Sequence, residues 1–175
     1  MRLGHQHVPT AEDCRLFQAM KARRTTRRPF TPESLPAPLW AALHTAAQQE
    51  GVWLRLVAEP AARTALAELV AVGDLIQWAD ATFRHEQAAW IRLAADAEPD
   101  GIPIRNLGLS GRERNSTATL AESPAAWDHQ LAASAPMLAV FYTANDRPLY
   151  WLVAGQALAR VLLRAAAAGV GASLL

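Results

Sequence analysis

The chain has 175 residues, one domain's length, and with 51% apolar and 19% charged residues it can bury a hydrophobic core rather than stay disordered. Its 17 basic and 16 acidic residues give a net charge of +1, too little to attract nucleic acid or an anionic membrane over a distance. A single cysteine, Cys14, excludes an internal disulfide and any metal site built from several thiolates.

Membrane insertion and secretion are not expected from the sequence. The longest strongly apolar stretch, residues 151–163, contains Gly155, Gln156 and Arg160 and is too short to cross a bilayer. The first eight residues contain two histidines and an arginine but no apolar run, so they do not match a signal peptide. We therefore expect a cytoplasmic protein that contacts neither membrane nor nucleic acid.

The N-terminal third predicts two helices and a strand. A helix over residues 11–22 should follow Thr10 and Asp13, whose spacing is typical of a capping box. Residues 23–38 carry four prolines and must form a loop or extended arm. A second helix should begin near Leu39 and end at Gly51, and the alternation over residues 52–57 then predicts a strand.

The middle of the chain predicts a long helical segment followed by a long loop. A helix should open at Pro60, restart near Gly73 and continue to about residue 94. Residues 96–134 are rich in Gly, Pro, Ser and Asn, which predicts a long loop, or a lid over a bound ring, within the domain.

The C-terminal part predicts a buried strand over residues 137–142 and a helix over residues 148–168 that is apolar on nearly every face and therefore buried on all sides. We expect Trp151, Leu152 and Leu158 to lie near an exposed apolar patch or a partner interface, formed with a second copy or with a missing half of the protein. Five tryptophans also lie on predicted apolar faces and are expected in the core: Trp40, Trp53, Trp78, Trp90 and Trp151.

The densest functional pattern is the run R-R-T-T-R-R-P-F over residues 23–30. Guanidinium groups chelate two phosphate oxygens, and threonine hydroxyls donate to a third. In an extended stretch, alternation would turn Arg23, Thr25 and Arg27 to one side. The alternative, to which we give equal weight at this stage, is that arginines after a helix complement its dipole and solvate the chain reversal.

This run, with the proline-rich arm and helix after it, resembles the opening of the nitroreductase family, whose usual signature is R-R-S-x-R shortly before a Phe. More narrowly, it is similar to the second half of actinobacterial nitroreductase-like proteins in which two such halves are fused. Supporting stretches lie at residues 46–51, 78–90, 100–103 and 151–163, and the resemblance spans about residues 8–175.

The resemblance implies an α+β fold with a central, mainly antiparallel sheet flanked by helices, and an FMN held between two halves or protomers. NADH or NADPH would be the reductant and a small molecule the electron acceptor. The family's phosphate-binding arginine falls on Arg23, its next basic residue on Arg24, its serine on Thr25 and its second basic residue on Arg27. The hydride chemistry belongs to the cofactor, so no catalytic residue and no metal ligand is expected.

Two departures from the family pattern bear on activity. The family's Asn-x-Gln-Pro-Trp loop has no counterpart between Gln48 and Trp53, and the region that meets the flavin ring edge would begin where this chain ends. We therefore expect a single, partial nitroreductase-like domain over residues 1–175, truncated at its C-terminus, that forms a homodimer or pairs with a missing half. The alternative is a degenerate flavin-binding or structural module that retains the fold without turnover.

Overall fold

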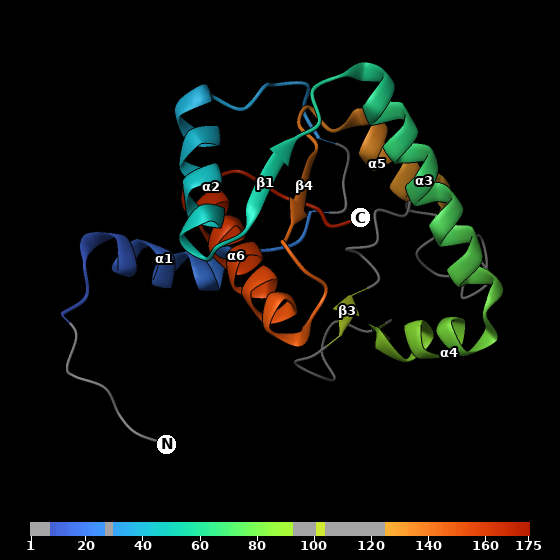
Figure 1. Cartoon of the computed structure of the whole chain (residues 1–175). Coiled ribbons are helices and arrows are strands. Elements are labelled where there is room, and N and C mark those ends of the chain that lie inside the picture. The colour runs from blue at the N-terminus through green and yellow to red at the C-terminus, as the bar shows by residue number, and fades with distance from the viewer. Residues whose placement is uncertain (1–7, 27–29, 93–100, 104–124) are drawn as a thin grey trace. The chain divides into compact units, whose positions relative to one another are not determined.

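The computed structural model describes residues 8–26, 30–92, 101–103 and 125–175, which form an α+β fold made mostly of helices (Figure 1). The chain divides into two compact units, each assembled from separate stretches. The first unit contains Met1–Thr25, Leu35–Arg55 and Ala139–Ala172, and the second contains Thr26–Ser34, Leu56–Leu138 and Ser173–Leu175. The prediction of one domain over residues 1–175 stays a prediction.

The first unit is a short sheet packed on helices. It contains α1 (Ala11–Ala22), α2 (Ala37–Gln49) and α6 (Pro148–Ala167), together with the paired strands β1 (Trp53–Leu56) and β4 (Ala139–Tyr142). The Trp53 ring stacks on the Tyr142 ring, and at the other end the Val57 N–H donates to the Leu138 carbonyl at 2.8 Å. This register makes the two strands antiparallel, and it agrees with the predicted strands at residues 52–57 and 137–142.

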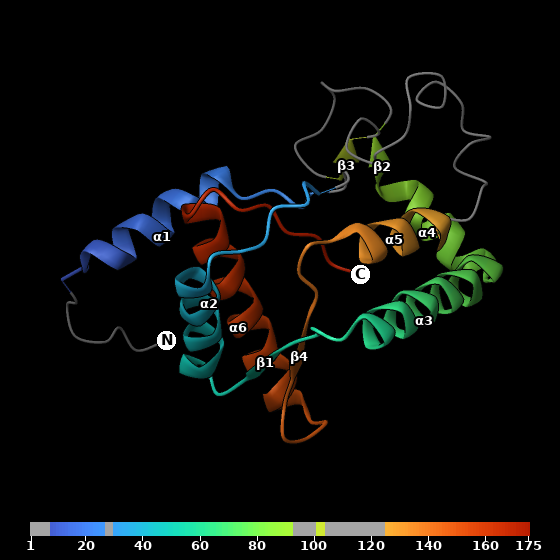
Figure 2. The same cartoon turned by 90° about the horizontal axis from the view of Figure 1, so that it is seen from above.

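Small side chains hold the core of the first unit together. Helix α6 packs between α1 and α2, and Figure 2 shows α2 and α6 side by side. Alanines at the contact let the helix backbones approach closely, while larger residues of α2, β1 and α6 fill the space between them. The buried cluster consists of Leu43, Ala46, Ala47, Leu54, Val161 and Ala165.

Local capping signals set the helix ends of this unit as predicted. Thr10 Oγ1 accepts from the Asp13 N–H, and the Asp13 side chain accepts from the Thr10 N–H, so the capping box is confirmed. Gly51 and Gly169 end α2 and α6 with φ of 76° and 74°, a conformation that costs glycine little. The next residue in each case, Val52 or Val170, donates back to the last helical turn.

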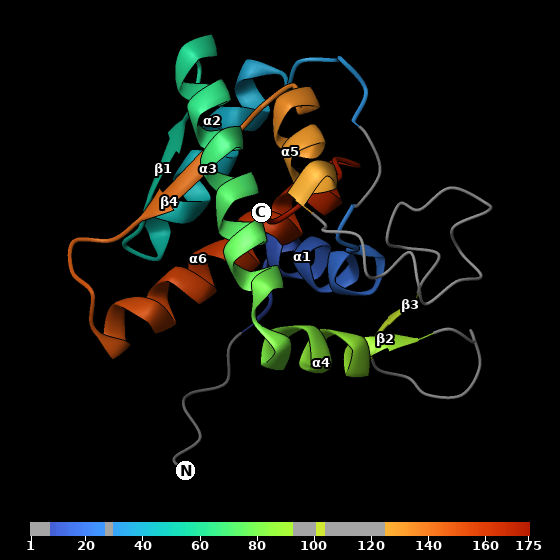
Figure 3. The ribbon, with the colours of Figure 1, turned by 90° about the vertical axis from the view of Figure 1, so that its right-hand side faces the viewer.

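The second unit is a pair of packed helices with a short appendage. It contains α3 (Pro60–Ala79), α4 (Ala81–Trp90), α5 (Ala125–Ser134) and the two-residue parallel strands β2 (Ile91–Arg92) and β3 (Ile102–Pro103). Helix α5 packs along α3 (Figure 3). The Arg63 guanidinium of α3 donates to the carbonyls of Ala135 and Pro136 just after α5, which fixes the end of that contact.

Three predictions about the second unit are wrong. Helix α3 continues through Gly73, and the break comes at Asp80, whose side chain accepts from the Thr82 N–H and so starts a new helix. That new helix ends at Trp90 rather than near residue 94. Residues 125–134, the end of the predicted loop over residues 96–134, form helix α5 instead, while residues 96–100 and 104–124 lie outside the described ranges.

The expected burial of α6 and of the tryptophans is also wrong in part. The C-terminal half of α6 faces α1 and α2, but its first turns do not, and Leu149, Trp151 and Leu152 are 66%, 62% and 62% exposed. Trp53 and Trp90 are exposed as well, whereas Trp40 packs against the core and Trp78 is half-buried. Apolar composition marks a face that favours burial, but the available neighbours decide whether it is covered. Trp151 and Leu152 are thus exposed, whereas Leu158 is half-buried, and the partner interface expected near them stays a prediction.

Candidate functional site

The arginine- and threonine-rich run begins where α1 ends. The Arg23 N–H still bonds to the Ala19 carbonyl at 2.8 Å, but with ψ of 127° the Arg23 backbone turns out of the helix. Two residues later, Thr25 forms an isolated parallel bridge with Ala172, which follows α6. The backbone at the start of this run, from Arg23 to Thr25, is thus held by neighbours within the first unit.

Arg23 and Thr25 point toward each other. The Arg23 Nη1 atom lies 3.5 Å from Thr25 Oγ1, and both side chains are half-buried. This is the proximity that alternation along an extended stretch predicts. A guanidinium next to a hydroxyl can direct several N–H and O–H donors at one anion, which is the arrangement that a phosphate group requires.

Arg24 has a different environment. Its Nη1 atom donates to the Lys21 carbonyl at 2.9 Å and to the Arg23 carbonyl at 2.7 Å, so the guanidinium covers the last turn of α1. Carbonyls at a helix C-terminus lack intrahelical partners and carry partial negative charge. The helix-end interpretation of the arginine run therefore fits Arg24, and the cofactor role implied for Arg24 by the resemblance stays a prediction.

The electrostatics of the run make Arg23 the decisive residue among those described. An anion near Thr25 would lie close to the C-terminal end of α1, where the helix dipole disfavours negative charge. A guanidinium must offset that field, and Arg24 already bonds to helix carbonyls. Arg27, the other predicted ligand, lies outside the described residues, so its convergence with Arg23 and Thr25 stays a prediction.

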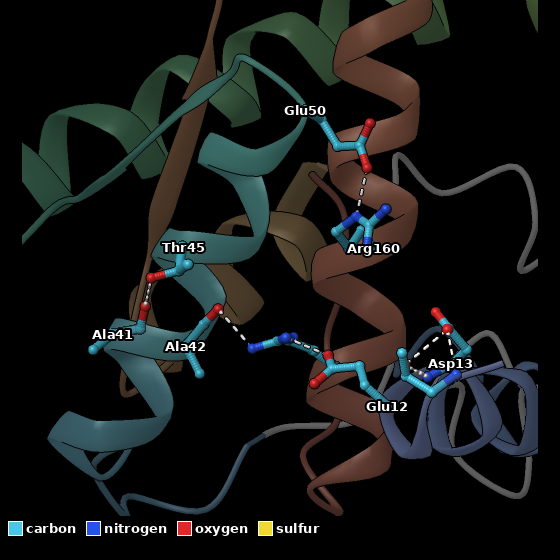
Figure 4. A network of polar contacts seen from close by, with 9 residues as sticks. Glu12, Asp13, Ala41, Ala42, Thr45, Glu50 and Arg160 are labelled. Atoms are coloured by element: carbon cyan, nitrogen blue, oxygen red, sulfur yellow. Dashed lines mark hydrogen bonds and ion pairs between the residues drawn. The ribbon is translucent and has the colours of Figure 1, made fainter. Parts of the chain in front are cut away.

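A polar network that sequence reasoning missed joins the helices of the first unit (Figure 4). Arg164 of α6 pairs with the carboxylate of Glu12 on α1, and its Nη1 atom lies 3.5 Å from the Ala42 carbonyl on α2. One turn earlier, the Arg160 Nε atom donates to Glu50 at 2.5 Å. Two arginines four residues apart on an otherwise apolar helix were the available signal, because buried guanidinium groups need partners.

A second feature missed from the sequence is Asp74 in the second unit. It shares a face of α3 with Ala67 and Val70, and its Oδ2 atom is buried without a hydrogen-bond partner among the described groups. Burial away from water disfavours the charged carboxylate and raises the pKa of Asp74. A shifted pKa marks candidate functional groups, but a single buried carboxyl does not define a site, so we assign Asp74 no chemical role.

The remaining sequence signals add no second site. Within residues 96–134, predicted as a loop or a lid over a bound ring, residues 96–100 and 104–124 lie outside the described ranges, so the lid stays a prediction. Within the described ranges, no group of three or more His, Cys, Asp and Glu side chains could hold a metal ion. None of the described helices combines the length and the hydropathy needed to span a bilayer.

Comparisons of the chain with protein-family models, with curated proteins and with solved structures found no match. A functional assignment therefore depends on two observations: the geometry of Arg23 and Thr25, and the family resemblance of the sequence around them.

Proposed function

We propose that the chain is a nitroreductase-type module that binds FMN, with Arg23 and Thr25 as ligands of the FMN phosphate. The observation that carries the proposal is the 3.5 Å approach of the Arg23 guanidinium to the Thr25 hydroxyl, in a stretch held by the Thr25–Ala172 bridge. The resemblance of residues 23–30 to the family's phosphate-binding opening supplies the identity of the anion.

The donor set suits the phosphate end of FMN. Arg23 can present two parallel N–H groups to two oxygens, and Thr25 can donate its hydroxyl hydrogen to a third. Arg27 would add a second positive charge from two residues further along. When bound, FMN would supply hydride transfer from NADH or NADPH to a small-molecule electron acceptor, while the protein binds and orients the reactants.

The proposal includes a fold and a setting. In the proposed fold, the antiparallel β1–β4 pair belongs to a central, mainly antiparallel sheet, and α2 and α6 are two of the helices that flank this sheet. The module works in the cytoplasm as a homodimer or paired with a second half. The packing of α2 and α6 beside Leu54 and Phe141 supports this layering.

A second candidate, a flavin-binding module without turnover, is favoured by the tight turn after α2. Gly51 and Val52 donate to the Gln48 and Ala47 carbonyls, so the chain passes from α2 into β1 with no room for the family's Asn-x-Gln-Pro-Trp loop. Contacts to the flavin ring expected from that loop would have to come from elsewhere. Phosphate binding and ring positioning are therefore separable in this chain.

The proposal is tested by titrating the purified chain with FMN and with riboflavin, which lacks the phosphate, while following flavin absorbance and fluorescence. We expect FMN to bind about tenfold or more tightly than riboflavin, since charge-assisted hydrogen bonds contribute about 1.5–3 kcal/mol. Inorganic phosphate should compete with FMN but not with riboflavin. Equal affinities for the two flavins would contradict the proposed phosphate site. NADPH oxidation measured in the same samples distinguishes an active oxidoreductase from a flavin-binding module without turnover.

A further inference from the structure

Helix α1 has few apolar contacts with the rest of the first unit. Ala19 is its one buried residue, whereas its large side chains Phe17 and Met20 are 66% and 60% exposed. The buried cluster of the unit is formed by α2, β1 and α6 and contains no residue of α1. A helix of 12 residues is marginally stable in water by itself, so the position of α1 depends on a small number of contacts.

Two contacts outside the apolar core hold the ends of α1. In its first turn, the Glu12 carboxylate pairs with the Arg164 guanidinium of α6 (Figure 4). Just after its last turn, Thr25 forms the bridge with Ala172. Figure 2 shows α1 beside the C-terminal end of α6, where both contacts are made. The same segment, α6 with the residues that follow it, therefore holds α1 at both ends.

Arg164 is fixed independently of α1. Its Nη1 atom lies 3.5 Å from the Ala42 carbonyl of α2, and its neighbour Ala165 belongs to the buried cluster between α2 and α6. The guanidinium is thus held by the part of the unit that packs without α1. It provides a prepared docking point for the Glu12 carboxylate.

The proposed phosphate ligands depend on the docking of α1. The Arg23 N–H donates to the carbonyl of Ala19, the one residue that α1 buries, and the Arg23 guanidinium lies beside the Thr25 hydroxyl. If α1 leaves α6, both ligands lose their backbone anchors, and a bound anion would have to order them again at an entropic cost. Anion affinity is then reduced in proportion to the fraction of chains in which α1 is docked.

We propose that Glu12 is a positioning residue: its pair with Arg164 keeps α1 docked and so holds Arg23 and Thr25 together for the FMN phosphate. This inference rests on the proposed function, which supplies the anion. Glu12 lies about 18 Å from the ligands, the length of the 12-residue helix, and so acts through α1 rather than by contact. Because coupling between two sites is reciprocal, bound FMN should also stabilise the docked state of α1.

The first test is amide hydrogen exchange of the full chain with and without FMN. Without ligand, the amides of α1 should exchange faster than those of α2, because α1 opens locally. FMN at ten times its dissociation constant should slow exchange in α1 about tenfold, since it binds only the docked state. Riboflavin at the same concentration should not. Exchange in α1 as slow as in α2, or unchanged by bound FMN, would overturn the coupling.

The second test compares Glu12→Ala with the matched control Glu50→Ala, which removes the carboxylate that pairs with the other arginine of α6, at the end of α2. Glu12→Ala should speed exchange in α1 and weaken FMN binding about threefold to tenfold, with riboflavin binding unchanged. Glu50→Ala should do neither. Glu12→Gln keeps an oxygen that can accept from Arg164 and should restore part of the affinity.

The outcomes separate the positioning role from the proposed function. A wild-type chain that prefers FMN to riboflavin, with the preference unchanged in Glu12→Ala, would overturn the role of Glu12 and leave the phosphate site standing. Equal weakening by Glu50→Ala would also overturn it, because the effect would then not act through α1. A wild-type chain that binds the two flavins equally would overturn the phosphate site and the positioning role together. Circular dichroism checks that each variant folds.

Discussion

The guanidinium of Arg164 pairs with the carboxylate of Glu12 across 152 residues of sequence, joining the C-terminal half of α6 to the first turn of α1. The same guanidinium reaches the Ala42 carbonyl of α2, so one side chain contacts all three helices of the first unit. The side chains of Arg164 and Glu12 are 21% and 39% exposed, so the arginine holds two helices through contacts that are only partly shielded from water.

Replacement of Arg164 by methionine should therefore be costly. We expect Arg164→Met to lower the free energy of unfolding by about 2 kcal/mol, measured by urea denaturation. The control is Arg160→Met, which breaks the single contact with Glu50, whereas Arg164 contacts both Glu12 and the Ala42 carbonyl; the expected loss is therefore smaller, about 1 kcal/mol. Equal losses for the two variants would contradict the bridging role of Arg164.

Asp74 should destabilise the second unit at neutral pH. Burial raises the pKa of this carboxyl, so the folded chain binds the proton more tightly than the unfolded chain does. Stability then falls as the pH rises from the unfolded-state pKa through the folded-state pKa, and the full penalty is present above both.

Removal of that charge should reverse the penalty. We expect Asp74→Asn to raise the free energy of unfolding by about 1 kcal/mol at pH 7 and to flatten its dependence on pH in the acidic range. Glu68→Gln, a change on the exposed face of the same helix, is the control and should change stability little. A destabilised Asp74→Asn variant would indicate that the carboxylate has a stabilising partner.

The stacked rings of Trp53 and Tyr142 should couple β1 to β4. Their centroids lie 5.4 Å apart with an angle of 17° between the planes. A double-mutant cycle with Trp53→Ala and Tyr142→Ala should give a coupling energy of about 0.5–1 kcal/mol. A cycle of Trp53→Ala with Phe17→Ala on α1 should be additive, and coupling as large there would show that the ring contact is not its source.

Features set by neighbouring residues could be predicted from the sequence. The capping box at Thr10 and the glycines after α2 and α6 act within one helical turn, so their consequences follow from the local pattern. The helix breaks at Asp80 and not at Gly73, because the N-cap preference of an aspartate outweighs the small cost of a single glycine within a helix.

Features set by distant packing could not be predicted. Nothing local to Glu12 indicates Arg164 as its partner, and composition alone did not reveal which faces of α6 lack a neighbour. In the candidate site, alternation was enough to bring Arg23 toward Thr25. That Arg24 turns back to the Lys21 and Arg23 carbonyls could not be predicted, because it depends on the path that the backbone takes after α1.

Turnover should be slow even if FMN binds. The proposed phosphate ligands would anchor only one end of the cofactor, and the turn at Gly51 stands where the resembled family has a loop that contacts the ring. Misplacement of reactants by about 1 Å can cost roughly a hundredfold in rate. We expect reduction of nitroaromatics by NADPH to be slow or absent with added FMN, and turnover on the order of 10 per second would contradict this expectation.

The most direct measurement compares FMN and riboflavin affinities for the wild type and for Arg23→Ala. The control is Arg15→Ala, which removes an exposed arginine from α1, the helix that ends just before Arg23. Arg23→Ala should weaken FMN binding about tenfold to a hundredfold, equivalent to about 1.5–3 kcal/mol, and leave riboflavin binding unchanged. Arg27→Ala should lower FMN affinity on the same scale, and Arg15→Ala should not. Unchanged FMN affinity in Arg23→Ala, or an equal loss for riboflavin, would contradict a phosphate site at Arg23 and Thr25.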